Sequence, residues 1–343
     1  MNRLLLVGTI AISSLIMGCT DKREPTSTHT LQKEDIKIAV FHHILSTSFV
    51  AAQIEDQNGQ SCFDKAGLNP LLNKRSKGPE VVDAIVSGSV EFGTLAITPQ
   101  VFQILQGVNL TTFTTYQTSA LDIKFVANKS AGITTPNQMK NKRIGYVGGT
   151  YGEIFLERYI QKYGIPKKDI ILTSGGPAYL RDLLINGELD GAILWEPVVQ
   201  DLLLADSSNI DKWYIDVDQS IYTARVNLLA TPDVLKENKS KAKKLVQALI
   251  CSEQYLIEQP KLVQTRLEKW LDRPTGSLTG VFHPETFRVT YDEKSLRADL
   301  KAESEWAKSA VFNNKVTIPT DFAPYITDEV LKQVNPERII TSK

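Results

Sequence analysis

The residues with the most evident chemistry lie in short loops that follow apolar, strand-like runs. The segment GGTYG at 148–152 follows RIGYV and opens a predicted helix. Its glycines, Gly152 among them, allow backbone N–H groups to approach a ligand while Thr150 caps the helix. This arrangement suits an anionic or polar group, and the alternative is an ordinary glycine-rich turn. A dinucleotide site is not expected, because Val147 stands where the dinucleotide fingerprint requires its first glycine.

Aromatic and charged side chains occupy comparable loops. The aromatic residues are Tyr151, Tyr179, Trp195 and Tyr222. They either enclose an apolar or heteroaromatic ligand or pack within the protein. Glu196 either accepts hydrogen bonds from an amine or ring N–H or caps local structure, and Asp122 has the same two interpretations. Arg225 either neutralises an acidic ligand group or forms a structural salt bridge.

Two adjacent histidines, His42 and His43, follow the first predicted strand. Neighbouring side chains on an extended segment point in opposite directions, so the pair cannot easily serve one metal, and either is eligible to face a ligand. The sequence contains no CxxC or HExxH motif to complete a metal site. It also lacks a G-x-S-x-G elbow and a P-loop, so we expect neither a metal nor an enzyme.

An internal repeat organises the body of the chain. Residues 78–99 (GPEVVDAIVSGSVEFGTLAITP) correspond to residues 176–197 (GPAYLRDLLINGELDGAILWEP). Each begins with Gly-Pro, continues as an amphipathic helix that ends at a glycine, and finishes as an apolar strand before a proline. The offset is 98 residues at the first glycine, 99 at the second and 98 at the prolines, with Gly93 aligned to Gly191. The alternative is a chance likeness of two generic β-α units.

The repeat predicts two similar α/β lobes. Short β-rich runs at 35–41 and 142–147 precede the two copies, so each copy is expected to have the order β-α-β-α-β. Two further strand-rich stretches, at 119–135 and 213–230, are expected to cross between the lobes and to form a double hinge. Helical patterns follow at Pro232 to Glu258, 260–272, 284–309 and 327–334.

Ligands of open parallel sheets bind beyond the carboxyl ends of the strands. The candidate ligand-binding residues in those loops are His42, His43, Thr94, Ser119, Asp122, Thr150, Tyr151, Gly152, Tyr179, Trp195, Glu196, Tyr222 and Arg225. Cys62 and Cys251 both belong to the first lobe if the chain returns there after residue 226. In an oxidising compartment they either form a disulfide or remain two buried free thiols.

Four segments carry a family resemblance: 62–72 (CFDKAGLNPLL), 86–95 (VSGSVEFGTL), 137–165 (NQMKNKRIGYVGGTYGEIFLERYIQKYGI) and 185–197 (INGELDGAILWEP). In their order and spacing they resemble the type II extracytoplasmic solute-binding proteins of ABC importers. That family includes binders of sulfonates, taurine, nitrate and thiamine-type pyrimidines. The resemblance covers most of residues 36–260, and the last 80 or so residues match only as generic helices.

The resemblance implies an α/β fold of two Rossmann-like lobes with mainly parallel sheets, a double-crossover hinge and a helical C-terminal region. Lobe 1 would contain residues 35–120 and 222–343, and lobe 2 residues 121–221. It implies a monomer without cofactor that captures a small molecule, a sulfonate-like oxyanion or a heteroaromatic, for a permease with a cytoplasmic ATPase. The alternatives are a ligand sensor for a signalling receptor and a pyrimidine-synthesis enzyme, whose cysteine-dense motif is absent here.

Composition and the N-terminal segment predict where the protein works. The 343 residues carry 39 Lys+Arg and 39 Asp+Glu, which excludes nucleic-acid binding by charge alone. Residues 1–18 have the charged and apolar regions of a secretory signal peptide, and the segment before Cys19 resembles a bacterial lipobox. We therefore expect lipidation of Cys19, a flexible tether at 19–34 and an extracytoplasmic protein held to a bacterial membrane.

Overall fold

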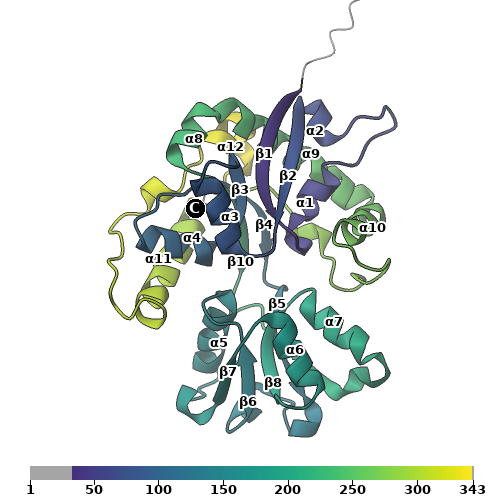
Figure 1. Cartoon of the computed structure of the whole chain (residues 1–343), viewed down its shortest axis with the longest axis vertical. Helices are drawn as coiled ribbons and strands as arrows, with labels where there is room; N and C mark the ends of the chain where they lie inside the picture. The colour runs from purple at the N-terminus through teal and green to yellow at the C-terminus, as the bar shows by residue number, and fades with distance from the viewer. Residues whose placement is uncertain (1–32, 342–343) are drawn as a thin grey trace, which may run out of the picture. The chain divides into compact units, whose positions relative to one another are not determined.

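The computed structural model describes residues 33–341. The predicted signal peptide, Cys19 and most of the predicted tether lie outside the described residues, and the first strand, β1, begins at Glu34. No helix in the described part of the chain is both long and apolar enough to cross a membrane. The described residues form one compact unit that contains two five-stranded sheets (Figure 1).

The first sheet has the strand order β2-β1-β3-β10-β4. Its strands are β1 (Glu34–Phe41), β2 (Leu68–Arg75), β3 (Phe92–Ala96), β4 (Thr111–Ser119) and β10 (Ala224–Ala230). The short or intervening helices on its two sides are α1 (Thr47–Ala51), α2 (Cys62–Lys65), α3 (Gly78–Val86) and α4 (Ile97–Leu105). Figure 1 shows α3 and α4 on one side of this sheet and α1 and α2 on the other.

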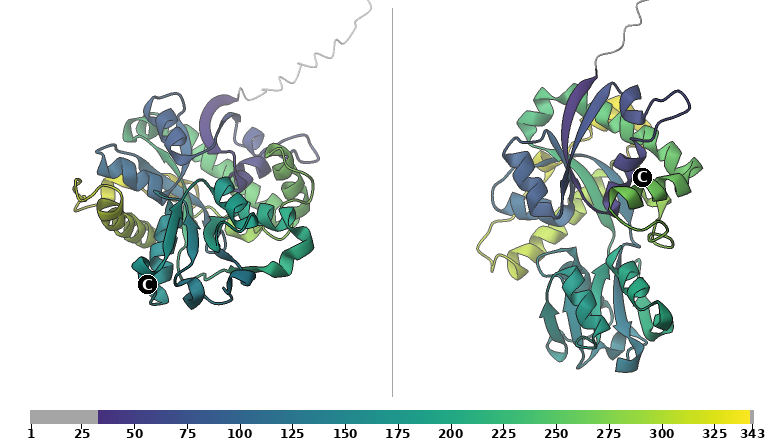
Figure 2. Two further views of the ribbon diagram at one scale, coloured as in Figure 1. Left: turned by 60° about the horizontal axis from the view of Figure 1, so that its bottom comes forward. Right: turned by 45° about the vertical axis from the view of Figure 1, so that its right-hand side comes forward.

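The second sheet has the equivalent order β7-β6-β8-β5-β9. Its strands are β5 (Ile123–Asn128), β6 (Arg143–Tyr146), β7 (Ile171–Ser174), β8 (Gly191–Trp195) and β9 (Trp213–Asp216). Its helices are α5 (Tyr151–Lys162), α6 (Pro177–Ile185) and α7 (Val198–Ala205). Separate apolar clusters, one around α5 and one around α6 and α7, cover the sheet, and Figure 2 shows helices on both of its faces.

The chain crosses between the two sheets twice. The chain leaves β4 after Ser119 and enters the second sheet as β5, and it leaves β9 after Asp216 and returns as β10. Both β5 and β10 pair antiparallel with their two neighbours, whereas β1 and β6 pair parallel with theirs. The expected α/β class with two similar lobes and two crossings is therefore confirmed, with one reversed strand in each sheet.

The internal repeat is also present in the structure, where the equivalent elements are a constant 99 residues apart, whereas the sequence alignment varied between 98 and 99. Helices α3 and α6 begin 99 residues apart and each has nine residues, and strands β3 and β8 also begin 99 residues apart. Phe92, not Gly93, is thus the counterpart of Gly191, so the alignment of these two glycines was wrong by one position. The repeated acids are equivalent: Glu91 accepts from the backbone N–H of Lys37 (2.7 Å), and Asp190 from that of Arg143 (2.8 Å).

The C-terminal helices complete the first sheet's core. They are α8 (Pro232–Glu237), α9 (Lys239–Glu258), α10 (Pro260–Trp270), α11 (Glu293–Ala310) and α12 (Glu329–Val334). The single helix expected from Pro232 to Glu258 is interrupted at Asn238, whose side-chain amide donates to the carbonyl of Val234 (3.0 Å). The helix expected from 284 begins only at Glu293, where the Asp292 side chain accepts from the N–H of Ser295.

A disulfide joins the beginning of the body to this C-terminal region. Cys62 of α2 is bonded to Cys251 of α9, with their Cα atoms 5.7 Å apart and a sequence separation of 189. Of the two alternatives that the sequence left open, the structure has the disulfide. The bond closes a loop that contains the whole second sheet, because β5 to β9 lie between the two cysteines in sequence.

Candidate functional site

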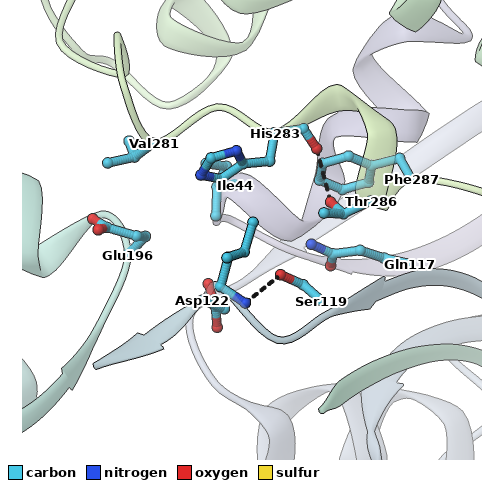
Figure 3. A pocket seen from close by; sticks show the side chains of 10 residues that line it. Ile44, Gln117, Ser119, Asp122, Glu196, Val281, His283, Thr286 and Phe287 are labelled. Atoms are coloured by element: carbon cyan, nitrogen blue, oxygen red, sulfur yellow. Dashed lines mark hydrogen bonds between the residues drawn. The ribbon is translucent and has the colours of Figure 1, made fainter. Parts of the chain in front are cut away.

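A small pocket, with about 20 Å³ of internal space, takes its walls from residues at the strand ends of both sheets. Figure 3 shows its side chains converging from several elements. They come from the first strand's loop and β4, the first crossing, the end of β8 and a C-terminal loop: Ile44, Gln117, Ser119, Leu121, Asp122, Glu196, Val281, His283, Thr286 and Phe287. The pocket therefore lies at the carboxyl ends of strands, where the sequence predicted a ligand.

Two buried acids face the pocket. Asp122 is 8% exposed and Glu196 3% exposed, and the backbone N–H of Glu196 donates to the carbonyl of Asp122 (3.0 Å). One oxygen of Glu196 forms an ion pair with Lys124, and the other accepts from the N–H of Gln200 (3.1 Å). Burial and the neighbouring charge of Glu196 raise the pKa of Asp122 to about 7. Asp122 thus changes charge near neutral pH.

Aromatic rings hold Asp122 in place. The hydroxyl of Tyr151, at the start of α5, donates to Oδ2 of Asp122 (3.2 Å). The Tyr151 ring lies 4.8 Å from the ring of Trp195 and stacks at 5.9 Å on that of Tyr222. Three of the four predicted aromatics therefore come together, with Tyr151 in contact with the other two. These three rings, called the aromatic wall below, pack beside Asp122, and none of them lines the pocket.

The helix N-terminus at GGTYG is occupied by the protein's own groups. Oγ1 of Thr150 accepts from the N–H of Gly152 (3.1 Å), as the sequence predicted for a cap, and donates to the carbonyl of Val147 (2.7 Å). The carboxylate of Glu153 accepts from the N–H of Gly149 (2.8 Å). A Cβ at Gly152 would lie 3.2 Å from the Trp195 ring, so this glycine allows the aromatic wall to approach the helix.

The structure separates the two histidines. His43 is half-buried, and desolvation of its ring lowers its pKa to about 4, with the adjacent backbone of Glu196 opposing the change. The Nε2 atom of His43 has no hydrogen-bond partner among the described residues. The ring of His42 instead contacts Trp270, with Nε2 2.9 Å from its carbonyl oxygen. Of the two histidines, His43 thus lies against the backbone of Glu196, and neither lines the pocket.

The remaining predicted residues have diverse surroundings. Ser119 lines the pocket, and its hydroxyl accepts from the N–H of Leu121 (3.1 Å). Thr94 is fully buried in β3, where its hydroxyl accepts from the N–H of Phe41 (3.4 Å). Tyr179 on α6 is 57% exposed and does not line the pocket. Arg225 forms an ion pair with Asp299 of α11, which is the structural interpretation of the two considered.

Sequence reasoning missed the contribution of the C-terminal region. Val281, His283, Thr286 and Phe287 line the pocket from the loop between α10 and α11. This loop carries no motif, and its residues are far from the repeat in sequence, so no local signal identified them. Gln117 is a further omission, although its neighbours Ser119 and Asp122 were among the candidate residues. Among the described residues, no group of three or more His, Cys, Asp or Glu side chains could hold a metal ion.

The sequence model of the NMT1/THI5-like family matches residues 58–262. The chain belongs to this family. The match begins in the loop before α2 and extends into α10, so it includes both crossings, Asp122 and Glu196. The pocket loop at 281–287 lies beyond the matched residues, which agrees with the absence of any family motif there.

Relatives of this family member include binding proteins and an enzyme. The taurine-binding periplasmic protein of Escherichia coli is 22% identical over 279 residues, which cover 78% of this chain and 85% of that protein. The 4-amino-5-hydroxymethyl-2-methylpyrimidine phosphate synthase of Schizosaccharomyces pombe is 24% identical over 291 residues, which cover 78% and 79%. Both alignments span most of the two chains.

Solved structures confirm the two-lobe fold. The periplasmic aliphatic sulphonate binding protein SsuA from Escherichia coli superposes with a TM-score of 0.73 at 16% identity, covering 87% of this chain and 98% of that chain. The periplasmic nitrate-binding protein NrtA from Synechocystis PCC 6803 has a TM-score of 0.61 at 11% identity, covering 89% of each chain. At these identities the likeness establishes the architecture of this family member.

Proposed function

We propose that this chain is the solute-binding protein of an ABC importer, which captures a small organic molecule and presents it to a membrane permease. The observation that carries the proposal is the pocket, because its walls come from both sheets and from a crossing between them. Binding proteins among the relatives support the same role. A ligand held by both lobes at once would couple capture to lobe closure.

The pocket suits a molecule with a small apolar body and a polar head. Ile44, Leu121, Val281 and Phe287 supply apolar surface, while Gln117, Ser119 and the two acids supply polar groups. Micromolar affinity requires about 8 kcal/mol, and a single hydrogen bond to a charged group contributes about 1.5–3 kcal/mol. Contacts from both lobes and exclusion of water must therefore act together.

We also propose that the protein works outside the cytoplasm while held to a membrane. A lipid on Cys19 would hold the protein at the outer side of a bacterial membrane, and the tether at 19–34 would let the body reach its permease. The disulfide supports an oxidising compartment, since disulfides persist outside the cytoplasm. We propose lobe 1 at 35–120 and 222–343 and lobe 2 at 121–221, with a monomer as the working unit.

Gentle purification of the full chain from membranes, followed by mass spectrometry of released small molecules, tests the proposal directly. We expect one small organic molecule at near-stoichiometric amount, and X-ray scattering should show a smaller radius when it is added back to stripped protein. Identical radii with and without that molecule would contradict capture by lobe closure. Replacement of Cys19 by Ala should release the protein from the membrane fraction, and an unchanged distribution would contradict the lipid anchor.

A further inference from the structure

One ion pair joins the two sheets' surroundings away from the crossings. Asp201 lies on α7, whose Val199 and Leu202 pack in an apolar cluster with the second sheet. Arg273 follows α10, which packs in the core of the first sheet. Two nitrogens of the Arg273 guanidinium donate to the two carboxylate oxygens of Asp201. Of the ion pairs within the described residues 33–341, it is the one that joins the segment 121–221 to the rest of the chain.

This ion pair, called the latch below, is connected on one side to a pocket wall through the first turn of α7. Glu196 lines the pocket, and its carboxylate accepts from the N–H of Gln200 (3.1 Å). The N–H of Asp201 donates to the carbonyl of Pro197 (2.9 Å). Asp201 is therefore held within one helical turn of the strand end that carries Glu196.

The other side of the latch belongs to the loop that supplies the opposite pocket wall. Arg273 begins this loop, and residues 281–287 further along it line the pocket. The carboxylate of Glu268, which is 1% exposed, accepts from the loop N–H groups of Gly276 (2.8 Å) and Leu278 (3.0 Å). The N–H of Arg273 donates to the carbonyl of Glu268 (2.8 Å). The loop is thus fixed to α10, so the latch connects two pocket walls that belong to different sheets.

The pocket between these walls is too small to admit a ligand in this arrangement. Its internal space of about 20 Å³ is enough for about one water molecule. A larger molecule enters only after the two walls move apart, and that movement separates Arg273 from Asp201. The two side chains are 17% and 26% exposed, so water can solvate both groups when the latch opens.

We propose that the latch between Arg273 and Asp201 holds the empty pocket closed, so that a ligand must break it in order to enter. Paired charge-assisted hydrogen bonds between a guanidinium and a carboxylate give the latch its strength and its defined geometry. The latch is an autoinhibitory contact, because it stabilises the arrangement that excludes a ligand. The inference rests on the proposed function in one respect, namely that this pocket is the ligand site.

The test measures access to the pocket directly, in the full-length protein with Ser119→Cys. Ser119 lines the pocket and is 7% exposed, and the native Cys62 and Cys251 are joined in a disulfide. The rate of alkylation by N-ethylmaleimide, a reagent larger than water, reports how often the walls separate, and protein without the new cysteine gives the background rate. We expect Arg273→Gln and Asp201→Asn each to raise the rate by about 5- to 30-fold. The combined variant should react no faster than the faster single variant, because both remove the same interaction.

Two controls separate opening of the pocket from general loss of stability. Arg338→Gln removes a similarly buried ion pair, with Glu253, which lies wholly on the first sheet's side, so it should leave the rate at Ser119→Cys unchanged. Ala84→Cys places the thiol in the core of α3, where the residue is 3% exposed, and reports unfolding instead of opening. Its alkylation should be equally slow with and without the latch.

Spin labels provide a second readout that loosening of the loop alone would not change. Ile171 on β7 and Ile257 on α9 are 58% and 78% exposed and lie on the two sides of the latch. With cysteines at both positions, electron-spin distance measurements on the latch variants should show an additional distance population that is minor in the wild type.

The possible outcomes distinguish the latch from the proposed function. An unchanged alkylation rate at Ser119→Cys, an equal acceleration at Ala84→Cys, or rate effects of the two substitutions that multiply would each overturn the latch. An unchanged distance distribution would do the same. These results would leave the solute-binding role intact, because release of a small molecule from the purified protein tests that role separately. Faster alkylation together with no released molecule would support the latch and contradict the proposed function.

Discussion

Replacing Asp122 by Asn should make the empty protein more stable, by an amount that grows with pH. Burial raises the pKa of this carboxyl from 3.8 to about 7. The folded chain thus holds the proton more tightly than the unfolded chain. Stability from the protonated carboxyl is complete below about pH 4 and is lost as the pH rises through about 7.

The size of the effect follows from that pKa. At about 1.36 kcal/mol per pKa unit, the rise corresponds to about 4 kcal/mol of destabilisation at pH 8 and to about 1–2 kcal/mol at pH 5. The asparagine variant carries no such charge, and its side-chain oxygen can still accept from the hydroxyl of Tyr151. Its advantage over the wild type should therefore increase by about 3 kcal/mol between pH 5 and pH 8.

Urea unfolding of ligand-free protein at the two pH values measures this difference. Asp211→Asn is the control, because Asp211 is exposed and its replacement should be neutral at both pH values. Glu303→Gln should behave like the Asp122 variant, since burial raises the pKa of Glu303 to about 7 as well. A loss of stability in Asp122→Asn that is equal at pH 5 and pH 8 would refute the reasoning and indicate a structural role.

Three further predictions concern the fold and the site. Reduction of the disulfide between Cys62 and Cys251 should lower the free energy of unfolding by about 2–5 kcal/mol. Urea unfolding with and without reductant measures this difference. Alkylation of both thiols in non-reduced protein would contradict the bond. Gly93→Ala should lower the free energy of unfolding by about 1–3 kcal/mol, because its Cβ would lie 2.5 Å from an isoleucine of α3. Gly176→Ala is the control, because a Cβ at Gly176 would meet open space. Equal urea midpoints for the two variants would refute the clash. Tyr151→Phe removes a hydrogen bond that lowers the pKa of Asp122, so the pH at which the stability contribution of Asp122 is lost should move upward in urea unfolding. An unchanged pH dependence of stability would contradict this role of the bond.

The repeat was recognisable in the sequence because the two copies need the same residue types at equivalent positions. The acids Glu91 and Asp190 accept from equivalent strand N–H groups, so both positions carry an acidic side chain. The helix-ending glycines Gly88 and Gly187 have φ values of 72° and 74°, which favour glycine. Such requirements are local and leave a pattern. The alignment of Gly93 with Gly191 failed because the two glycines make room for different neighbours, an isoleucine of α3 and a phenylalanine of β5.

The sequence by itself determined the two related α/β units, the two crossings and most of the loops at the site, because periodicity, helix caps and turn glycines are local consequences of backbone geometry. Only the tertiary structure decided which side chains in those loops meet. It separated His43 from His42, paired Arg225 with Asp299 and brought Gln117 together with Asp122 and a loop more than 150 residues further along. These outcomes depend on how distant segments fold against one another, and burial at those contacts sets the charge of Asp122.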